Sequence, residues 1–163
     1  MKHIDCFLLY EDFAATERLV SLLSQHPLIN QIYLITHQEQ PRPIASARLL
    51  KAEQLWNSAL MQQIAQSTSA SYALIQTRKG TPELGQFALE RFIRIADDTQ
   101  AGLIYADYQI AQEGKTEPHP VIDYQFGSLR DDFDFGPLLL FRKEALHMAA
   151  RSTTADYQFA ALY

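Results

Sequence analysis

The sequence has few glycines and a single cysteine, and these shortages argue against several common kinds of site. Six glycines in 163 residues form no dinucleotide-binding, Walker or nucleophile-elbow pattern, which disfavours dinucleotide oxidoreductases, P-loop NTPases and serine hydrolases. Cys6 lies in an apolar stretch and cannot pair within the chain, so we expect a buried free thiol. The five histidines are scattered without the spacing of metal ligands.

Excess positive charge and long apolar runs are also missing. The net charge is −5, which argues against a nucleic-acid partner bound through its phosphates. No apolar run reaches the roughly 18 residues of a membrane span. Asp5 stands where a signal peptide would build its apolar core, so no secretion signal is predicted. With 47% hydrophobic and 20% charged residues, the composition is that of one ordinary globular domain, expected in the cytoplasm.

Short apolar runs alternate with stretches of helical periodicity along most of the chain. Strands are predicted over residues 4–10, 31–36, 71–77, 103–108 and 137–142. Helices are predicted over residues 16–25, 46–66, 81–96, 143–150 and 155–163. A turn at residues 113–115 predicts a hairpin that returns through residues 118–120 to residues 121–124. This alternation predicts a three-layer α/β/α sandwich around a mainly parallel sheet, with ligands at the carboxyl ends of the strands.

Two boundaries of these helices carry their own signals. Thr81, Pro82 and Glu83 supply a hydroxyl cap, a first-turn proline and a carboxylate, which together indicate a helix start. The last helical pattern, residues 155–163, stops without any C-cap residue. We therefore expect the chain to be the N-terminal part of a longer protein, followed by an adjoining C-terminal domain.

The glycine-bracketed segment from Gly127 to Gly136 is unusually rich in charge for a turn. It holds one arginine and three carboxylates between aromatic residues: Arg130, Asp131, Asp132 and Asp134. Asp132 and Asp134, one residue apart on extended chain, would point to the same side and could share a hard cation or bind sugar hydroxyls. The alternative is a loop in which Arg130 pairs locally and the two phenylalanines of the segment enter the core.

Other polar residues stand at the expected strand ends. Tyr10 and Glu11 follow the first strand, Thr36 ends the second, and Asp107 belongs to the fourth. Tyr10 could stack on a base, although a tyrosine at a strand end is more often packed. The end of the third strand carries a threonine and two adjacent cations, Thr77, Arg78 and Lys79, which could meet an anion or be a solvated loop.

Several strings, taken in order, resemble the family 2 glycosyltransferases, which have the GT-A fold of nucleotide-diphospho-sugar transferases. The resemblance covers essentially the whole chain. The strings are Phe7–Asp12 (first strand and nucleotide loop), Ile32–His37 (second strand), Leu55–Ala59 (helix with an asparagine), Ala70–Lys79 (the strand that carries the metal motif), Ile104–Asp107 and Thr154–Phe159.

The resemblance implies a glycosyltransferase that uses a nucleotide-sugar donor and a saccharide or glycolipid acceptor in surface-polysaccharide assembly, in the cytoplasm or at the inner membrane. Asp156 matches the catalytic base of an inverting displacement, although capping the last helix would equally explain its position. The family's metal-binding Asp-x-Asp is replaced by Thr77, Arg78 and Lys79. Dependence on Mn²⁺ or Mg²⁺ is thus doubtful, and the two cations could stabilise the diphosphate instead.

Two other interpretations stay open. The first is a non-catalytic GT-A-like module that binds a nucleotide or glycan or serves as an interaction surface. The second is another nucleotide-using α/β enzyme such as a cytidylyltransferase, which is weaker because the glycine- and lysine-rich N-terminal loop of that class is missing.

Overall fold

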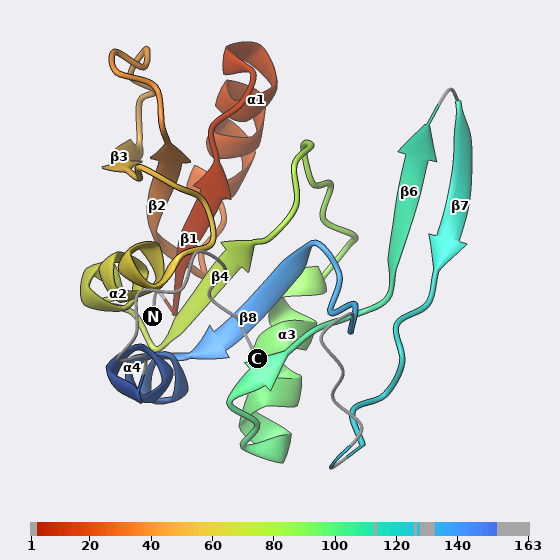
Figure 1. Cartoon of the computed structure of the whole chain (residues 1–163). Coiled ribbons are helices and arrows are strands. Elements are labelled where there is room, and N and C mark those ends of the chain that lie inside the picture. Colours follow the sequence, from red (N-terminus) through yellow and green to blue (C-terminus); the bar gives the residue numbers. More distant parts are fainter. Residues whose placement is uncertain (1–2, 113, 126, 128–132, 153–163) are drawn as a thin grey trace.

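The computed structural model describes residues 3–112, 114–125, 127 and 133–152 and contains a six-stranded sheet in the order β3-β2-β1-β4-β8-β5 (Figure 1). The neighbouring strands from β3 to β4 are parallel, and β8 runs antiparallel between β4 and β5. The predicted mainly parallel sheet is therefore confirmed. The strands are β1 (Ile4–Leu9), β2 (Ile29–Thr36), β3 (Ala47–Lys51), β4 (Tyr72–Gln76), β5 (Leu103–Ile104) and β8 (Leu138–Arg142).

Helices cover both faces of this sheet, which confirms the predicted three layers (Figure 1). Helices α1 (Phe13–Ser24) and α3 (Ala88–Thr99) pack on one face, and α2 (Ser58–Ser67) and α4 (Lys143–Ser152) pack on the other. Successive residues of a strand point to opposite faces. Accordingly, Cys6 and Leu8 of β1 join the first core and Phe7 and Leu9 join the second.

The central strands are buried on both faces, as their continuous apolar sequences predict. Every residue of β1 and of β4 is buried. Cys6 is among them, and burial raises the pKa of its thiol far above the ordinary range. The expected buried free thiol is confirmed, and its protonated state makes it a poor nucleophile.

The predicted first helix exists but begins earlier than its periodicity indicated. Asp12 is the N-cap of α1, and its carboxylate accepts a hydrogen bond of 2.8 Å from the Ala15 N–H. Only three residues therefore separate the end of β1 from the start of the helix. This short connection places the end of β1 and the start of α1 at the same edge of the sheet.

The single helix predicted over residues 46–66 is wrong. Residues Ala47–Lys51 form β3, paired in parallel with β2, and only Ser58–Ser67 form a helix. Trp56 has a left-handed φ of 62°, which interrupts an α-helix, and the Asn57 side chain caps α2 through the Leu60 N–H. The asparagine expected near the middle of a helix is thus its N-cap, and pairing with β2 has overridden the helical pattern of residues 47–51.

The predicted helix start at Thr81 is also wrong, since α3 begins at Ala88. Phe87 adopts a left-handed φ of 58° and is 62% exposed, so residues 81–87 form a loop between β4 and the helix. The buried face of α3 consists of Leu89, Phe92 and Ala96, and Ile95 is exposed rather than buried. The hydroxyl, proline and carboxylate signals at residues 81–83 occur in a loop that only leads to the helix.

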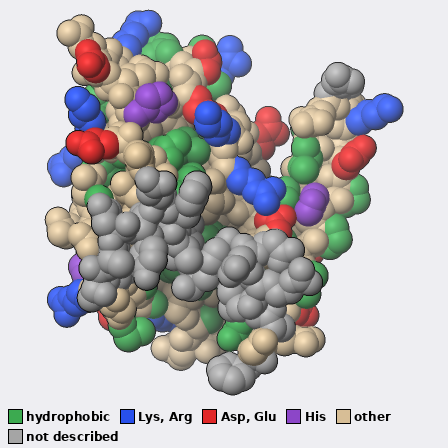
Figure 2. Space-filling view, in the orientation of Figure 1, with side chains coloured by type: hydrophobic (Ala, Val, Ile, Leu, Met, Phe, Trp, Pro, Cys, Tyr) green, Lys and Arg blue, Asp and Glu red, His purple; other side chains and the backbone are tan. Residues whose placement is uncertain are grey.

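A hairpin is present where its turn was predicted, but its returning strand lies at residues 115–119 rather than 121–124, and it stands apart from the sheet (Figures 1 and 2). Strands β6 (Tyr108–Gln112) and β7 (Lys115–His119) pair antiparallel with each other. The fourth predicted strand ends at Ile104, because residues 105–107 leave the sheet to reach this hairpin. In Figure 2 a notch separates the hairpin from the body of the molecule.

The fifth predicted strand and the helix after it are confirmed as β8 and α4. The expected final helix, residues 155–163, lies outside the described residues. Among the helices that the structure describes, none combines the length and the apolar character that crossing a bilayer requires.

Candidate functional site at the carboxyl edge of the sheet

The chain changes direction across the sheet between β1 and β4. From β1 it proceeds to β2 and β3 on one side, and it then crosses over to β4 on the other side of β1. In open α/β sheets, ligands bind outside the carboxyl ends of the strands at such a reversal point. The loops at this reversal point are residues 10–12 after β1 and residues 77–80 after β4.

These two loops are tied together by hydrogen bonds. The Glu11 carboxylate accepts a hydrogen bond of 2.7 Å from the Gly80 N–H. The buried Gln76 side chain accepts from the Leu9 N–H at 3.1 Å and donates to the carbonyls of Arg78 and Gly80, both at 2.7 Å. Gln76 therefore shapes the loop after β4 from within, although a glutamine closing an apolar strand was not recognised as a site residue.

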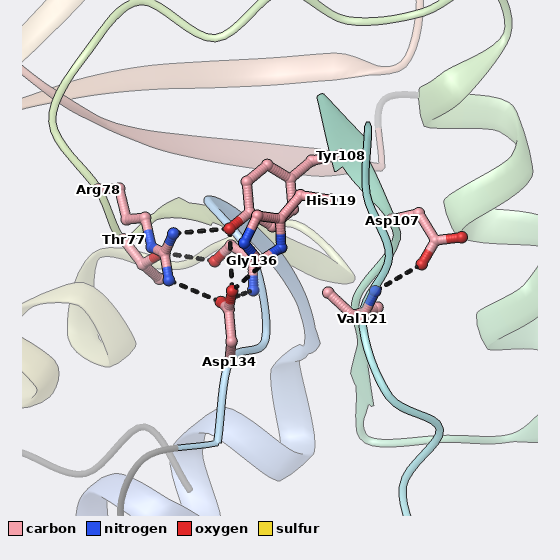
Figure 3. Close-up of polar contacts among 8 residues, drawn as sticks. All are labelled: Thr77, Arg78, Asp107, Tyr108, His119, Val121, Asp134 and Gly136. Atoms are coloured by element: carbon pink, nitrogen blue, oxygen red, sulfur yellow. Dashed lines mark hydrogen bonds and ion pairs between the residues drawn. The ribbon is translucent and has the colours of Figure 1, made fainter. Parts of the chain in front are cut away.

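Arg78 and Asp134 form the centre of a polar cluster that joins three segments of the chain (Figure 3). The Arg78 guanidinium lies 2.7 Å from Asp134 Oδ1 and donates to the Tyr108 hydroxyl at 2.7 Å. Tyr108 in turn donates to Asp134 Oδ2 at 2.9 Å, and His119 Nδ1 lies 3.7 Å from the same oxygen. We call Arg78, Tyr108, His119 and Asp134 the edge cluster.

Each member of the edge cluster reaches it from a different element. Arg78 follows β4, Tyr108 begins β6, His119 ends β7, and Asp134 precedes β8. The rings of Tyr108 and His119 are stacked with centroids 4.7 Å apart, because the two residues are cross-strand partners in the hairpin. The edge cluster thus fastens the hairpin to the carboxyl edge of the sheet.

Backbone geometry holds Asp134 in place. The Gly136 N–H donates to Asp134 Oδ1 at 2.8 Å, and the Thr77 hydroxyl donates to the Gly136 carbonyl at 2.8 Å. Gly136 has a φ of +81°, and an added Cβ would meet the Tyr108 ring at 3.2 Å. Only glycine fits this conformation and this contact without strain.

The charges of the edge cluster follow from these contacts. Burial acts to raise the pKa of Asp134, but the Gly136 N–H, the Tyr108 hydroxyl and the charges of Arg78 and His119 outweigh it, so the pKa is lowered. The pKa of Tyr108 is raised by burial first and then by its hydrogen bond to Asp134. Asp134 is therefore an anion and Tyr108 a neutral hydroxyl at neutral pH.

The remaining candidate residues lie in various settings around this edge. Lys79 is exposed and makes no ion pair or hydrogen bond with any described residue. Asp107 is exposed and accepts a hydrogen bond of 2.8 Å from the Val121 N–H. Tyr10 is buried with its hydroxyl donating to the Arg42 carbonyl, and the buried Thr36 accepts from the Gln38 N–H.

Four candidate residues, Arg130, Asp131, Asp132 and Asp156, lie outside the described residues. The two phenylalanines of the charged segment do approach the core, as one of the two interpretations expected. Phe135 is buried and Phe133 is partly buried, and both contact the Tyr105 ring edge-on.

The described side chains at this edge do not suit a divalent cation. Asp134 has both oxygens engaged by donors, one of them a guanidinium, and Thr77, Arg78 and Lys79 offer no carboxylate. Among the described residues, no three histidine, cysteine, aspartate or glutamate side chains gather as metal ligands would.

A shallow hollow of about 590 Å³ lies elsewhere, against α1 and the start of the chain segment that enters β3. Its lining includes Arg18, Leu22 and Ile44 and none of the strand-end residues above. It is open to solvent and holds no convergent set of charged groups, so the reversal point remains the better candidate.

Comparison with known proteins establishes the fold. The structure is similar to the crystal structure of 4-diphosphocytidyl-2C-methyl-D-erythritol synthase from Anaerococcus prevotii, with a TM-score of 0.58 and 10% sequence identity. The match covers 99% of this chain and 79% of that chain. No protein-family model matches the sequence, and no curated protein matches it. The chain thus has a Rossmann-like fold that it shares with this synthase, and the low identity carries no finer conclusion.

Proposed function

We propose that this chain binds a nucleotide-diphospho-sugar at the carboxyl edge between β1 and β4 and transfers the sugar to a saccharide or glycolipid acceptor. The observation that carries the proposal is the pair of cations, Arg78 and Lys79, in the loop after β4 at the reversal point of the sheet. Anions are bound at such points by donors and cations fixed on the strand-end loops.

In this proposal the cations replace a metal ion. Lys79 is free of described partners and Arg78 lies beside it, so together they would offset the charge of the leaving nucleoside diphosphate. Tyr10, Glu11 and Thr36 belong to the two strand ends on the nucleotide side. Because Tyr10 and Thr36 are buried, their contribution would be to shape the loops rather than to stack on the base.

The acceptor would enter from the side of the notch, near Asp107 and the edge cluster, with Arg130, Asp131 and Asp132 in the adjoining segment. In an inverting displacement, Asp156 takes the proton from the acceptor hydroxyl as that oxygen forms the bond to the anomeric carbon. The bond to the nucleoside diphosphate breaks in the same step, and its electron pair leaves with the diphosphate. An adjoining C-terminal domain and a place in the cytoplasm or at the inner membrane belong to the same proposal.

Calorimetric titration with UDP, GDP, CDP and their sugars, with and without Mn²⁺, tests donor binding. We expect one nucleotide family to bind without Mn²⁺ and Lys79→Ala to weaken it roughly tenfold, about 1.4 kcal/mol. Lys143→Ala is the matched control, since Lys143 lies at the opposite edge of the sheet beside Ser69. Equal losses in both variants would remove Lys79 from the site.

Transfer itself is tested with the donor that binds, by following release of the nucleoside diphosphate in the presence of candidate acceptors. We expect Asp156→Asn to abolish turnover while leaving donor affinity unchanged, because the base acts on the acceptor and not on the donor. Undiminished turnover in this variant would remove Asp156 from the role of base.

A second candidate is a non-catalytic module that binds a nucleotide or a glycan. The observation in its favour is that Arg78, at the position of the family's metal motif, is already paired with Asp134 at 2.7 Å. Tight nucleotide binding with no transfer to any acceptor would support this candidate. Failure of every nucleotide to bind at millimolar concentration would overturn both candidates.

A cytidylyltransferase is supported less well, although the similar solved structure is a synthase of a cytidyl compound. The connection from β1 to α1 is only Tyr10–Asp12, and two of its three residues are carboxylates. A nucleoside triphosphate would meet negative charge there instead of backbone donors and cations. Pyrophosphate release from CTP would be the result in its favour.

A further inference from the structure

The Asp134 carboxylate is surrounded by donors in the way that a bound anion would be. Oδ1 accepts from Arg78 and from the Gly136 N–H, and Oδ2 accepts from the Tyr108 hydroxyl with His119 Nδ1 at 3.7 Å. These groups come from the loop after β4, from the hairpin and from the segment before β8, and they converge on two oxygen atoms. Guanidinium, hydroxyl and backbone N–H groups are also the donors that proteins use to bind phosphate.

The carboxylate is also accessible enough to be exchanged. The Asp134 side chain is 28% exposed and the Arg78 side chain is 48% exposed, so solvent reaches both members of the ion pair. In Figure 2, acidic, basic and histidine side chains meet at the base of the notch between the hairpin and the body. A ligand entering the notch would meet the edge cluster directly.

An exposed ion pair of this kind is weak enough for a ligand to replace. Surface salt bridges contribute about 0–1 kcal/mol, whereas a phosphate carries more negative charge and more acceptor oxygens than a carboxylate. The donors of the edge cluster would therefore gain from the exchange. The backbone at Gly136 is held by the Thr77 hydroxyl, so exchange requires only the Asp134 side chain to rotate away while the Gly136 N–H stays in the site.

We propose that the donors around Asp134 form an anion-binding site for a phosphate group, and that Asp134 occupies it as an internal substitute until the ligand displaces it. This inference rests on the proposed function for the identity of the ligand, a diphosphate, but not for the existence of the site. Exchange would also free the hairpin from Asp134, since Tyr108 and His119 are its contacts there.

The test uses inorganic pyrophosphate at constant ionic strength and compares its affinity for the wild type and for Asp134→Asn. The variant keeps an acceptor for the Gly136 N–H but removes the competing charge, so we expect at least tenfold tighter binding. Asp98→Asn is the matched control because Asp98 forms an exposed ion pair with Arg94 on α3. Adding Arg78→Ala to Asp134→Asn is expected to abolish the gain.

Equal affinity in Asp134→Asn and Asp98→Asn would overturn the proposal. A second measurement does not depend on the fold of a variant: in the wild type, pyrophosphate must shift the amide resonance of Gly136 and the Arg78 Nε resonance. No shift at millimolar pyrophosphate would also overturn it. If Asp134→Asn binds pyrophosphate more tightly than the wild type does, but no nucleoside diphosphate binds more tightly than pyrophosphate, the anion site is retained and the nucleotide proposal is rejected. If a nucleotide binds equally well to the wild type and to Asp134→Asn, the anion site around Asp134 is rejected and the nucleotide proposal is retained.

Discussion

Two aspartates, one at each edge of the sheet, accept hydrogen bonds or ion pairs from a similar number of donors but differ in burial and in the charge of those donors. Asp5, at the amino end of β1, is fully buried and accepts from the N–H groups of Ser69 and Ala70, the Ser69 hydroxyl and the Asn30 amide. These donors are all neutral, and two belong to the backbone. Asp134, at the carboxyl edge, is partly exposed and paired with a guanidinium.

The difference shows what makes a polar cluster replaceable. Removing a fully buried acceptor leaves any donor buried with it, here the Ala70 N–H, without a partner, and the cost is the desolvation of that donor. Removing a partly exposed acceptor lets water or a ligand anion take its place. The Asp5 hydrogen bonds at the amino edge therefore serve a structural role, since they connect β1, β2 and the loop before β4. The carboxyl edge is the candidate binding site.

Replacing Asp5 should have the largest effect. In Asp5→Ala we expect the free energy of unfolding to fall by about 3 kcal/mol, because the buried Ala70 N–H loses its acceptor and the part-buried donors of Ser69 and Asn30 lose theirs. Urea denaturation measures this change, with the exposed Asp98→Ala as the control expected to change it by less than about 0.5 kcal/mol. If Asp5→Ala loses no more unfolding free energy than Asp98→Ala, the amino edge does not have this structural role.

A substitution at Gly136 should have the next largest effect. Gly136→Ala requires an alanine at a φ of +81°, with its Cβ 3.2 Å from the Tyr108 ring. We expect a destabilisation of about 2 kcal/mol and a loss of hydrogen-exchange protection in the hairpin, since the glycine supports Asp134. Gly114→Ala is the control, because Gly114 also has a positive φ but an added Cβ would meet no neighbouring atom. Its destabilisation measures backbone strain alone, and the excess at Gly136 measures the contact with Tyr108.

The ion pair at the carboxyl edge should contribute less. A double-mutant cycle with Arg78→Ala and Asp134→Ala should give a coupling energy of about 1 kcal/mol, because both side chains are partly exposed. The same cycle on Arg94 and Asp98 should give about 0.3 kcal/mol, as expected for an exposed helical pair. A larger coupling at the helical pair would mean that the edge cluster has no special geometry.

The smallest expected effect is the pH dependence of the stability that Asp134 contributes. Since the pKa of Asp134 is lowered in the folded protein, its stabilising contribution is present above the unfolded pKa and is lost as pH falls through the folded pKa. The stability difference between wild type and Asp134→Asn should therefore be constant from about pH 5 to pH 7 and shrink below about pH 4. Urea midpoints measured across this range provide the check, and a difference independent of pH would contradict the lowered pKa.

The layers of the fold could be predicted from the sequence because the buried strands and most helices carry strong local patterns. Residues 4–9 and 72–76 are apolar runs whose burial on both faces leaves little ambiguity. Two errors arose, at residues 47–51 and at residues 81–87. Pairing with β2 made residues 47–51 a strand, and α3 begins only after Phe87, whose backbone is left-handed.

The candidate site was predictable only in part. The charge of Arg78 and Asp134 and the position of each at a strand end could be read from the sequence. Their contact joins residues far apart in the chain, and the antiparallel placement of β8 beside β4 that brings them together has no local signal. Gln76 was missed for the same reason, since its amide matters only once β1 and the loop after β4 lie on either side of it.

The route from β5 to β8 has a consequence for how this protein could diversify. Ile104 of β5 lies opposite Leu140 of β8, so the intervening chain, which includes the hairpin and the charged segment, leaves and rejoins the sheet at adjacent antiparallel strands. A tight turn would suffice to connect two such strands. The connection is therefore longer than the sheet requires, and its loop-closure entropy grows only slowly with length. Apart from residues 133–136, which pack on the core and hold the edge cluster, its length can vary at little thermodynamic cost, so this part of the chain could change what it recognises while the sheet stays stable.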